Sequence, residues 1–159
     1  MKILLCCLAL LISTASFAQD AGPAPTAPED QPKAIATDQA YAEYERAIAP
    51  YVEQARQTYP DARHRFMSGQ LGNRPFFVTV RLSEDGRYED CFVRVLVIDE
   101  KSGDISGKIA NDIQIAKRYR NGQRIIVHEA DVRDWTIANP DGSEEGNVVG
   151  KFLSTYQTR

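Results

Sequence analysis

The chain has 159 residues, of which 43% are hydrophobic and 26% are charged, a composition that suits one folded domain with its own core. Its net charge is −3, from 19 basic and 22 acidic side chains. This balance argues against nucleic-acid binding, because proteins with that function present a basic surface to the phosphates.

Residues 1–18 have the features of a secretory signal peptide. Lys2 gives a positive start, residues 3–12 are all apolar, and the small residues Ser16 and Ala18 mark a cleavage site. The apolar run of about ten residues is too short to anchor the chain in a bilayer. We therefore predict an exported protein, periplasmic or secreted, with cleavage after Ala18 and no transmembrane anchor afterwards.

Residues 19–36 contain four prolines among alanine, threonine and acidic residues, without an apolar period. We predict a disordered or extended tether here, followed by a single domain over residues 37–159. Cleavage would remove Cys6 and Cys7 and leave only Cys91, so no internal disulfide is expected.

A helical region follows the tether. From Tyr41 to Tyr59, apolar side chains recur every three or four residues, which places them on one face of a helix. Pro50 lacks an amide hydrogen, so we expect a kink or the start of a second helix there. Pro60 repeats the interruption, and a further short helix is expected to end near Gly69.

Beyond residue 75 the hydrophobic period changes to two, which is typical of strands. Five strands are predicted, at residues 76–82, 88–98, 105–110, 123–128 and 135–138. In the second strand, alternation places Val93, Val95 and Val97 on one face and Leu96 and Ile98 on the other.

Helices followed by consecutive antiparallel strands indicate the α+β class. We predict N-terminal helices packed on a strongly bent antiparallel sheet of about five strands, with a small open barrel as the extreme form of the bend. The last segment, around Val149 and Tyr156, fits either a helix or a final strand.

Several short stretches follow one another at defined spacings. They are CFVRV at residues 91–95, ISGKIAN at 105–111, NGQRIIV at 121–127, VRDW at 132–135 and PDG at 140–142. In this order they resemble the YegJ-like family of bacterial proteins, a domain of unknown function, from about residue 53 to the end. The resemblance implies a shared fold, but no mechanism, because that family has no established catalytic residues.

One imidazole and three carboxylates lie within seven residues, at His128, Glu129, Asp131 and Asp134. Such side chains bind divalent metals and perform acid–base chemistry. A metal or acid–base site at His128, Asp131 and Asp134, in a small envelope hydrolase, is therefore one hypothesis. The spacing is not that of the H-E-x-x-H motif, and the alternative is a strand end followed by a capping and an exposed carboxylate.

Other residues suggest binding rather than catalysis. Trp135, the only tryptophan, either anchors a partner at the surface or packs in the core. Cys91 alternates with valines, which predicts a buried thiol. Basic residues occur in two groups that form either solvated faces or a surface for an acidic partner or anionic polymer. These are Arg56, Arg63, His64 and Arg65 in the helical region, and Lys117, Arg118, Arg120 and Arg124 near the third turn.

The sequence shows no G-x-S-x-G motif and no phosphate-binding loop. We therefore predict a non-catalytic binding module of the cell envelope that needs no cofactor and holds a protein partner on its bent sheet. The candidate contacts are Trp135, Arg118, Arg120 and Arg124.

Overall fold

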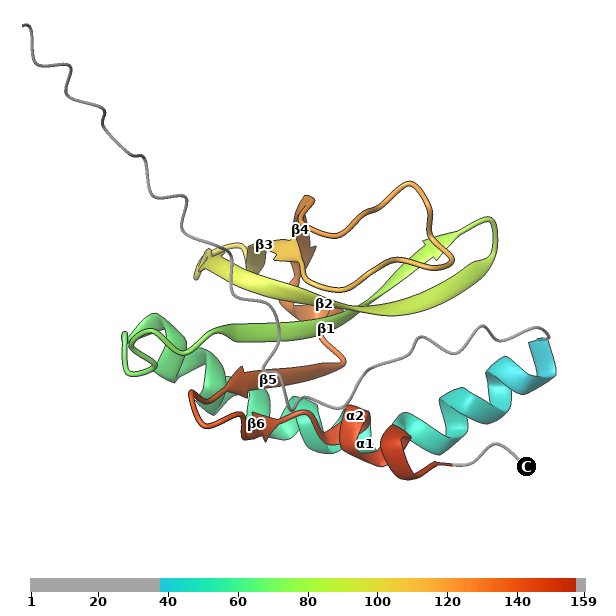
Figure 1. The fold of residues 1–159 in the computed structure, drawn as a ribbon, viewed down its shortest axis with the longest axis horizontal. Coiled ribbons are helices and arrows are strands. Elements are labelled where there is room, and N and C mark those ends of the chain that lie inside the picture. The colour runs from blue at the N-terminus through green and yellow to red at the C-terminus, as the bar shows by residue number, and fades with distance from the viewer. Residues whose placement is uncertain (1–37, 157–159) are drawn as a thin grey trace, which may run out of the picture.

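The computed structural model describes residues 38–156, so the predicted signal peptide and tether lie outside the described residues. Figure 1 shows the arrangement of the elements. In chain order they are α1 (Asp38–Met67), β1 (Phe76–Glu84), β2 (Arg87–Ile98), β3 (Asp104–Ile109), β4 (Arg124–His128), a 3-10 turn (Glu129–Asp131), β5 (Asp134–Ala138), β6 (Glu144–Gly146) and α2 (Val148–Thr155).

The strands form one open antiparallel sheet in the order β4-β3-β2-β1-β5-β6. The predicted α+β class is confirmed, with six strands in place of about five and no closure into a barrel. The sequence does not predict β6, because its three residues are too few to show a period. The last segment, for which the sequence fits both a helix and a strand, is the helix α2.

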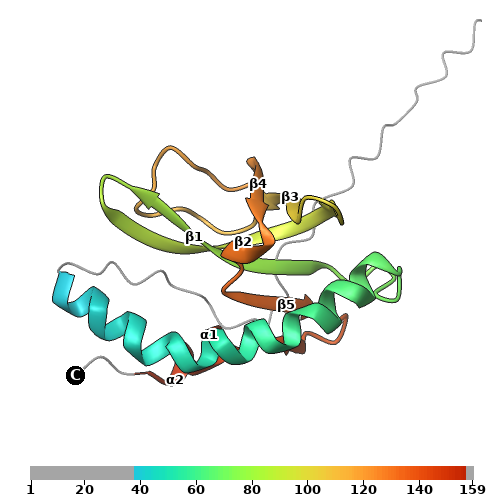
Figure 2. The same cartoon turned by 180° about the vertical axis from the view of Figure 1, so that it is seen from behind.

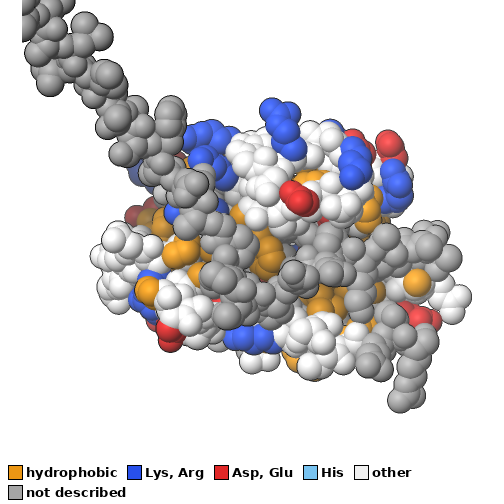
Figure 3. Space-filling model, viewed as in Figure 1, with side chains coloured by type: hydrophobic (Ala, Val, Ile, Leu, Met, Phe, Trp, Pro, Cys, Tyr) orange, Lys and Arg blue, Asp and Glu red, His pale blue; other side chains and the backbone are white. Residues whose placement is uncertain are grey.

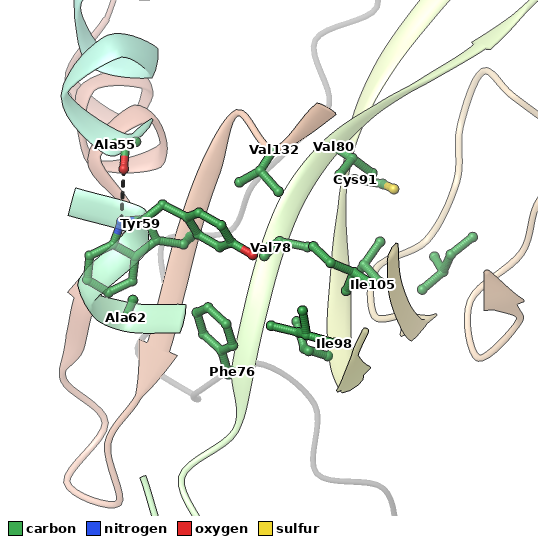
Figure 4. Close-up of a cluster of buried hydrophobic side chains, with 14 of the residues drawn as sticks. Ala55, Tyr59, Ala62, Phe76, Val78, Val80, Cys91, Ile98, Ile105 and Val132 are labelled. Atoms are coloured by element: carbon green, nitrogen blue, oxygen red, sulfur yellow. Dashed lines mark hydrogen bonds between the residues drawn. The ribbon is translucent and has the colours of Figure 1, made fainter. Parts of the chain in front are cut away.

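Side chains alternate between two faces of the sheet. The inner face packs against α1 and carries the main core, in which Ala55, Tyr59 and Ala62 of α1 meet Phe76 and Val78 of β1 (Figure 4). The helix lies in front of β5 when the molecule is seen from behind (Figure 2). The opposite, outer face carries the alternate residues of each strand. These are Phe77, Thr79, Phe92, Arg94, Ser106, Lys108, Arg124, Ile126, Thr136 and Ala138.

The expected breaks at Pro50 and Pro60 do not divide the helix, which runs unbroken from Asp38 to Met67 with both prolines inside. A proline inside a helix costs about 3 kcal/mol. Both rings are exposed, whereas the apolar stripe that the sequence predicts stays buried along the same helix. Burying each large apolar side chain contributes about 1.5–3 kcal/mol, so packing on the sheet and on α2 stabilises the unbroken helix. Of the predicted stripe, Ile48, Val52, Ala55 and Tyr59 are buried, and Ala62 extends it by one turn.

The core accounts for Cys91 and Trp135. Cys91 is 1% exposed, as predicted, and burial raises the pKa of its thiol to about 12, so the thiol is un-ionised at neutral pH. Trp135 is buried as well, and its indole N–H donates to the carbonyl oxygen of Ala55 (3.1 Å) and to the hydroxyl of Thr58 (3.0 Å). These hydrogen bonds join β5 to the middle of α1.

The faces predicted for β2 are correct for Val93 and Val95 and wrong for Val97 and Ile98. The register with β3 shifts between Val95 and Val97, so that Val97 lies opposite Ser106 on the outer face. An extra residue in one strand reverses the alternation after it. As a result Ile98 points into the core, while Val97 is 59% exposed and Leu96 36%.

Four charged side chains fix the N-terminal half of α1 to the sheet. Arg81 contacts Glu45 (2.7 Å) and Asp90 (2.9 Å), and Arg133 contacts Glu45 (3.0 Å) and approaches Asp90 (3.4 Å). Burial alone would raise the pKa of Glu45, but hydrogen bonds from Arg81 and the charge of Arg133 outweigh it and lower the pKa. The alternation of two cations and two anions lets all four be partly buried together.

Asp134 holds α2 in place. Its carboxylate accepts hydrogen bonds from the backbone amides of Trp135 (2.8 Å) and Val149 (2.7 Å), the latter in the first turn of α2. The side chains of α2 then pack on α1, where Tyr51 stacks on Phe152 at 4.1 Å between ring centroids. Burial raises the pKa of Asp134 to about 6, although the amide hydrogen bonds act in the opposite direction.

This pKa predicts a pH-dependent stability. Below about pH 4, Asp134 is protonated in both the folded and the unfolded chain, whereas up to about pH 6 only the folded chain keeps the proton. The resulting contribution, up to about 3 kcal/mol, is present below pH 4 and is lost as the pH rises through 6. The difference in unfolding free energy between the natural chain and Asp134→Asn, measured by urea denaturation, should fall across this range. Parallel pH profiles of the two proteins would contradict the prediction.

Candidate binding surface

Strand β4 is an open edge of the sheet, since β3 is its only neighbour among the described strands. Its side chains alternate between half-buried and exposed: Ile125 and Val127 pack on the core, and Arg124, Ile126 and His128 point outward. Ile126 is 70% exposed, more than any other large hydrophobic side chain in the described part of the chain. The edge therefore presents an isoleucine to solvent at its centre.

The exposed side chain of Ile126 belongs to a short apolar stripe across three strands. Register places Ile126 opposite Ser106 of β3, and Ser106 opposite Val97 of β2. Leu96, at the bulge, adds a third exposed aliphatic side chain. Adjacent strands lie about 4.8 Å apart, so Ile126 and Val97 stand about 10 Å from each other with only a serine between them.

A basic row runs parallel to this stripe. Arg124 of β4 lies opposite Lys108 of β3, and Lys108 lies opposite Arg94 of β2. Like charges on directly opposite residues repel one another, and neither Arg94 nor Lys108 is without an interaction partner. The side of the molecule seen in Figure 1 shows Lys and Arg side chains along its upper border, with Asp and Glu side chains among them (Figure 3).

The loop that leads into β4, residues 110–123, is held by one buried carboxylate. Glu89 is 4% exposed and accepts hydrogen bonds from the backbone amides of Gln114 (2.8 Å), Ile115 (2.7 Å) and Ala116 (3.2 Å). The same loop carries the predicted contacts Arg118 and Arg120. Both are exposed.

The predicted basic contacts divide in two. Arg118 donates to the carbonyl oxygen of Ser83 (2.8 Å) and lies over the ring of Tyr119, so it fastens the loop to β1. Arg120, in the loop before β4, and Arg124, the first residue of β4, are both exposed. The helical basic group is used internally, because Arg63 pairs with Glu129, Arg65 with Glu145, and Arg56 donates to a carbonyl of the chain before β5. The structure does not join the two groups into one surface.

The predicted set of His128, Asp131 and Asp134 is not brought together. Although β4 and β5 are consecutive in the chain, three other strands separate them in the sheet. The ring of His128 accepts from the amide of Ala130 and contacts a carbonyl of the β2–β3 turn, and Asp134 is used by α2. Within residues 38–156, no cluster of three or more His, Cys, Asp or Glu side chains is placed to hold a metal ion.

Trp135 is not part of the surface either, because its side chain is buried (8% exposed) and donates a hydrogen bond to α1. The alternative of a core tryptophan is therefore the one that the structure shows. Sequence reasoning did not single out Ile126 and Val97, which read as core positions in apolar strands. The edge position and the bulge that expose them leave no local signal in the sequence.

No family model, no curated protein and no solved structure matches the chain. The resemblance to the YegJ-like family thus stays a prediction. No helix within residues 38–156 combines the length and the apolar character that crossing a bilayer requires.

The role of Glu89 can be tested by mutation. Glu89→Ala would leave three backbone amides without their acceptor, and an unsatisfied buried donor costs about 1–3 kcal/mol. We expect a loss of at least about 3 kcal/mol of unfolding free energy in urea denaturation, with faster hydrogen exchange at residues 112–118. Glu89→Gln should lose less, because its amide oxygen still accepts.

Glu84 provides the matched control, since its carboxylate is close to the same loop but contacts only the amide of Arg118 at 3.4 Å. Glu84→Ala should change stability by less than about 0.5 kcal/mol. Equal effects of Glu89→Ala and Glu84→Ala would show that the buried carboxylate does not hold the loop.

Proposed function

We propose that this protein is a non-catalytic binding module of the cell envelope, exported to the periplasm or secreted, that holds a protein partner on β4. The observation that carries the proposal is the exposed side chain of Ile126, in the middle of an open edge strand. The fold class and the apolar stripe from Ile126 to Val97 support it.

Edge strands offer unpaired backbone groups to any extended chain, and most proteins protect them with charged side chains, bulges or covering loops. Here the two ends of β4 carry Arg124 and His128, but its centre carries Ile126. A partner segment that pairs with β4 would gain main-chain hydrogen bonds and place alternate side chains against Ile126. Burying that isoleucine would contribute about 1.5–3 kcal/mol to the association.

The positive charge of Arg124 favours a partner segment that carries an acidic side chain. Arg124 stands two residues from Ile126 on the same face, at the end of the basic row. A segment with an apolar side chain opposite Ile126 and an acidic one opposite Arg124 is complementary to this edge. Because Arg124 is exposed, its attraction acts mainly on the association rate and weakens as salt is added.

The test is affinity capture from the envelope fraction of the host with tagged protein, followed by quantitative mass spectrometry. Ile126→Asp should lower the amount of the main stoichiometric partner about tenfold, which corresponds to a loss of about 1.4 kcal/mol. The reason is that a carboxylate at the centre of the edge must be desolvated when the partner pairs with β4.

Met67→Asp is the control, because it makes the same change at another exposed apolar residue, 38% exposed at the end of α1. Its capture should stay within about twofold of the natural protein, as expected for a surface substitution outside the interface. A partner retained equally by Ile126→Asp and Met67→Asp would place the interface elsewhere. The absence of any stoichiometric partner would count against the binding function itself.

A further inference from the structure

Hydrogen bonds at both ends of β4 determine which of its backbone groups pair with β3. Directly before the strand, the carbonyl oxygen of Gln123 accepts from the amide of Ile109 (3.0 Å), and directly after it the amide of Glu129 donates to the carbonyl oxygen of Gly103 (2.8 Å). In an antiparallel pair, the positions that exchange such bonds recur at every second residue. Within β4, the residues at positions 125 and 127 are therefore the ones that pair with β3.

The other three residues of β4 are Arg124, Ile126 and His128, and their amides and carbonyl oxygens point away from β3 to the open edge. Among residues 38–156, no hydrogen-bond partner is found for these three amides and three carbonyl oxygens. The side chains of the same three residues are the exposed ones of the strand. An approaching chain therefore meets both the backbone groups and the side chains of these residues.

The edge is symmetric about Ile126. A second copy of β4, related by a twofold axis and running antiparallel with its own Ile126 opposite this one, places Arg124 of each copy opposite His128 of the other. In this register every outward amide and carbonyl oxygen of both strands gains a partner. The two Ile126 residues lie about 5.5 Å apart between Cα atoms. The exposed apolar stripe then continues from Val97 of one copy to Val97 of the other.

Other registers fit this edge less well. With Arg124 on the twofold axis, two guanidinium groups stand opposite each other, and like charges in that position are destabilising. Ile126 would then meet Gly122, which has no side chain to pack against it. With His128 on the axis, Ile126 would meet Ala130, which lies in the 3-10 turn after the end of β4. The register centred on Ile126 is therefore the one that the residues of this edge favour.

Charge supports the same register. Asp104 of β3 is exposed and lies opposite His128, in the row that Arg124 of the second copy joins. Two strand spacings, about 10 Å, separate that arginine from Asp104, and the twofold symmetry provides this attraction twice. The separation is close to the screening length in physiological salt, so the attraction contributes more to the association rate and to the register than to the affinity.

The opposite edge of the sheet limits such an assembly to two copies. When an edge pairs with itself, the result is a closed twofold dimer, and the described sheet then has only its β6 edge left. Strand β6 is three residues long, and the side chain of Glu145 at its centre is paired with Arg65 and Arg74. Short, charged edges resist the addition of further strands.

We propose that the partner of β4 is a second copy of this chain, and that the two copies join their sheets by antiparallel pairing of β4 about Ile126. The inference rests on the proposed function, since it names the protein that the binding edge holds. A strand of five residues gives an interface at the small end of the range for specific complexes, so the dimer is weak and reversible.

Charge substitutions on the twofold axis test the register, in sedimentation experiments on residues 19–159, the chain that export is expected to leave. Ile126→Glu and Ile126→Lys each place two like charges opposite one another, so each variant alone should dimerise about tenfold more weakly than the natural chain. An equimolar mixture of the two should dimerise again, because the mixed dimer joins opposite charges. That recovery also shows that both variants are folded. A mixture that dimerises no better than either variant alone would overturn the proposal.

Met67→Glu and Met67→Lys are the matched controls, because they make the same changes at an exposed residue outside β4. Each should dimerise within about twofold of the natural chain. A natural chain that stays monomeric at about 1 mM, the weak end of the affinity scale, would refute the dimer. So would a dimer that persists unchanged in Ile126→Glu.

Affinity capture with tagged protein separates this inference from the proposed function. Untagged copies of the same chain, lost with Ile126→Asp, are the captured partner that we expect. A chain that is monomeric at about 1 mM but captures another envelope protein through Ile126 would refute the dimer and keep the binding function. A chain that neither dimerises nor captures a partner would refute both.

Discussion

The main core depends on the packing of α1 against the sheet, because this helix supplies Ala55, Tyr59 and Ala62 to it. The loop before β4 adds Ile113 and Ala116 to the same cluster, and Ile125 and Val127 of β4 pack on it. Glu129, which follows β4, contacts both Tyr59 (3.0 Å) and Arg63 of α1 and so connects this end of β4 to the helix. A thirty-residue helix, about 45 Å long, can cover the sheet in this way despite its two prolines.

The sheet leaves aliphatic side chains exposed at two places. The register shift between Val95 and Val97 turns Val97 outward, and at the edge strand β4 the side chain of Ile126 is exposed. The other edge is different: β6 is three residues long, and its Glu145 is paired with Arg65 and Arg74. The two edges of the sheet therefore differ in chemistry, and only β4 offers an apolar side chain to a partner.

Local periodicity in the sequence predicts some elements of this fold and not others. The buried stripe of α1 and the first five strands follow from periodicity, since burial on one face requires those spacings. The interruptions predicted at Pro50 and Pro60 are absent from α1. The cost of a proline within a helix is outweighed by the free energy gained when a continuous apolar face is buried. The site predicted at His128, Asp131 and Asp134 is not formed, for another reason. Residues close in sequence are separated in space when consecutive strands are inserted on opposite sides of a sheet.

The sequence by itself determined the class of the fold, the apolar face of the helix, the turns and the buried thiol of Cys91, because each depends on residues within a few positions of one another. Only the tertiary structure decided that Trp135 is buried, that Glu89 holds the loop before β4, and that Val97 and Ile126 share an exposed stripe. Those features depend on strand order and on one register shift. Strand order is set by the packing of the whole chain around α1, and no local stretch of sequence encodes it.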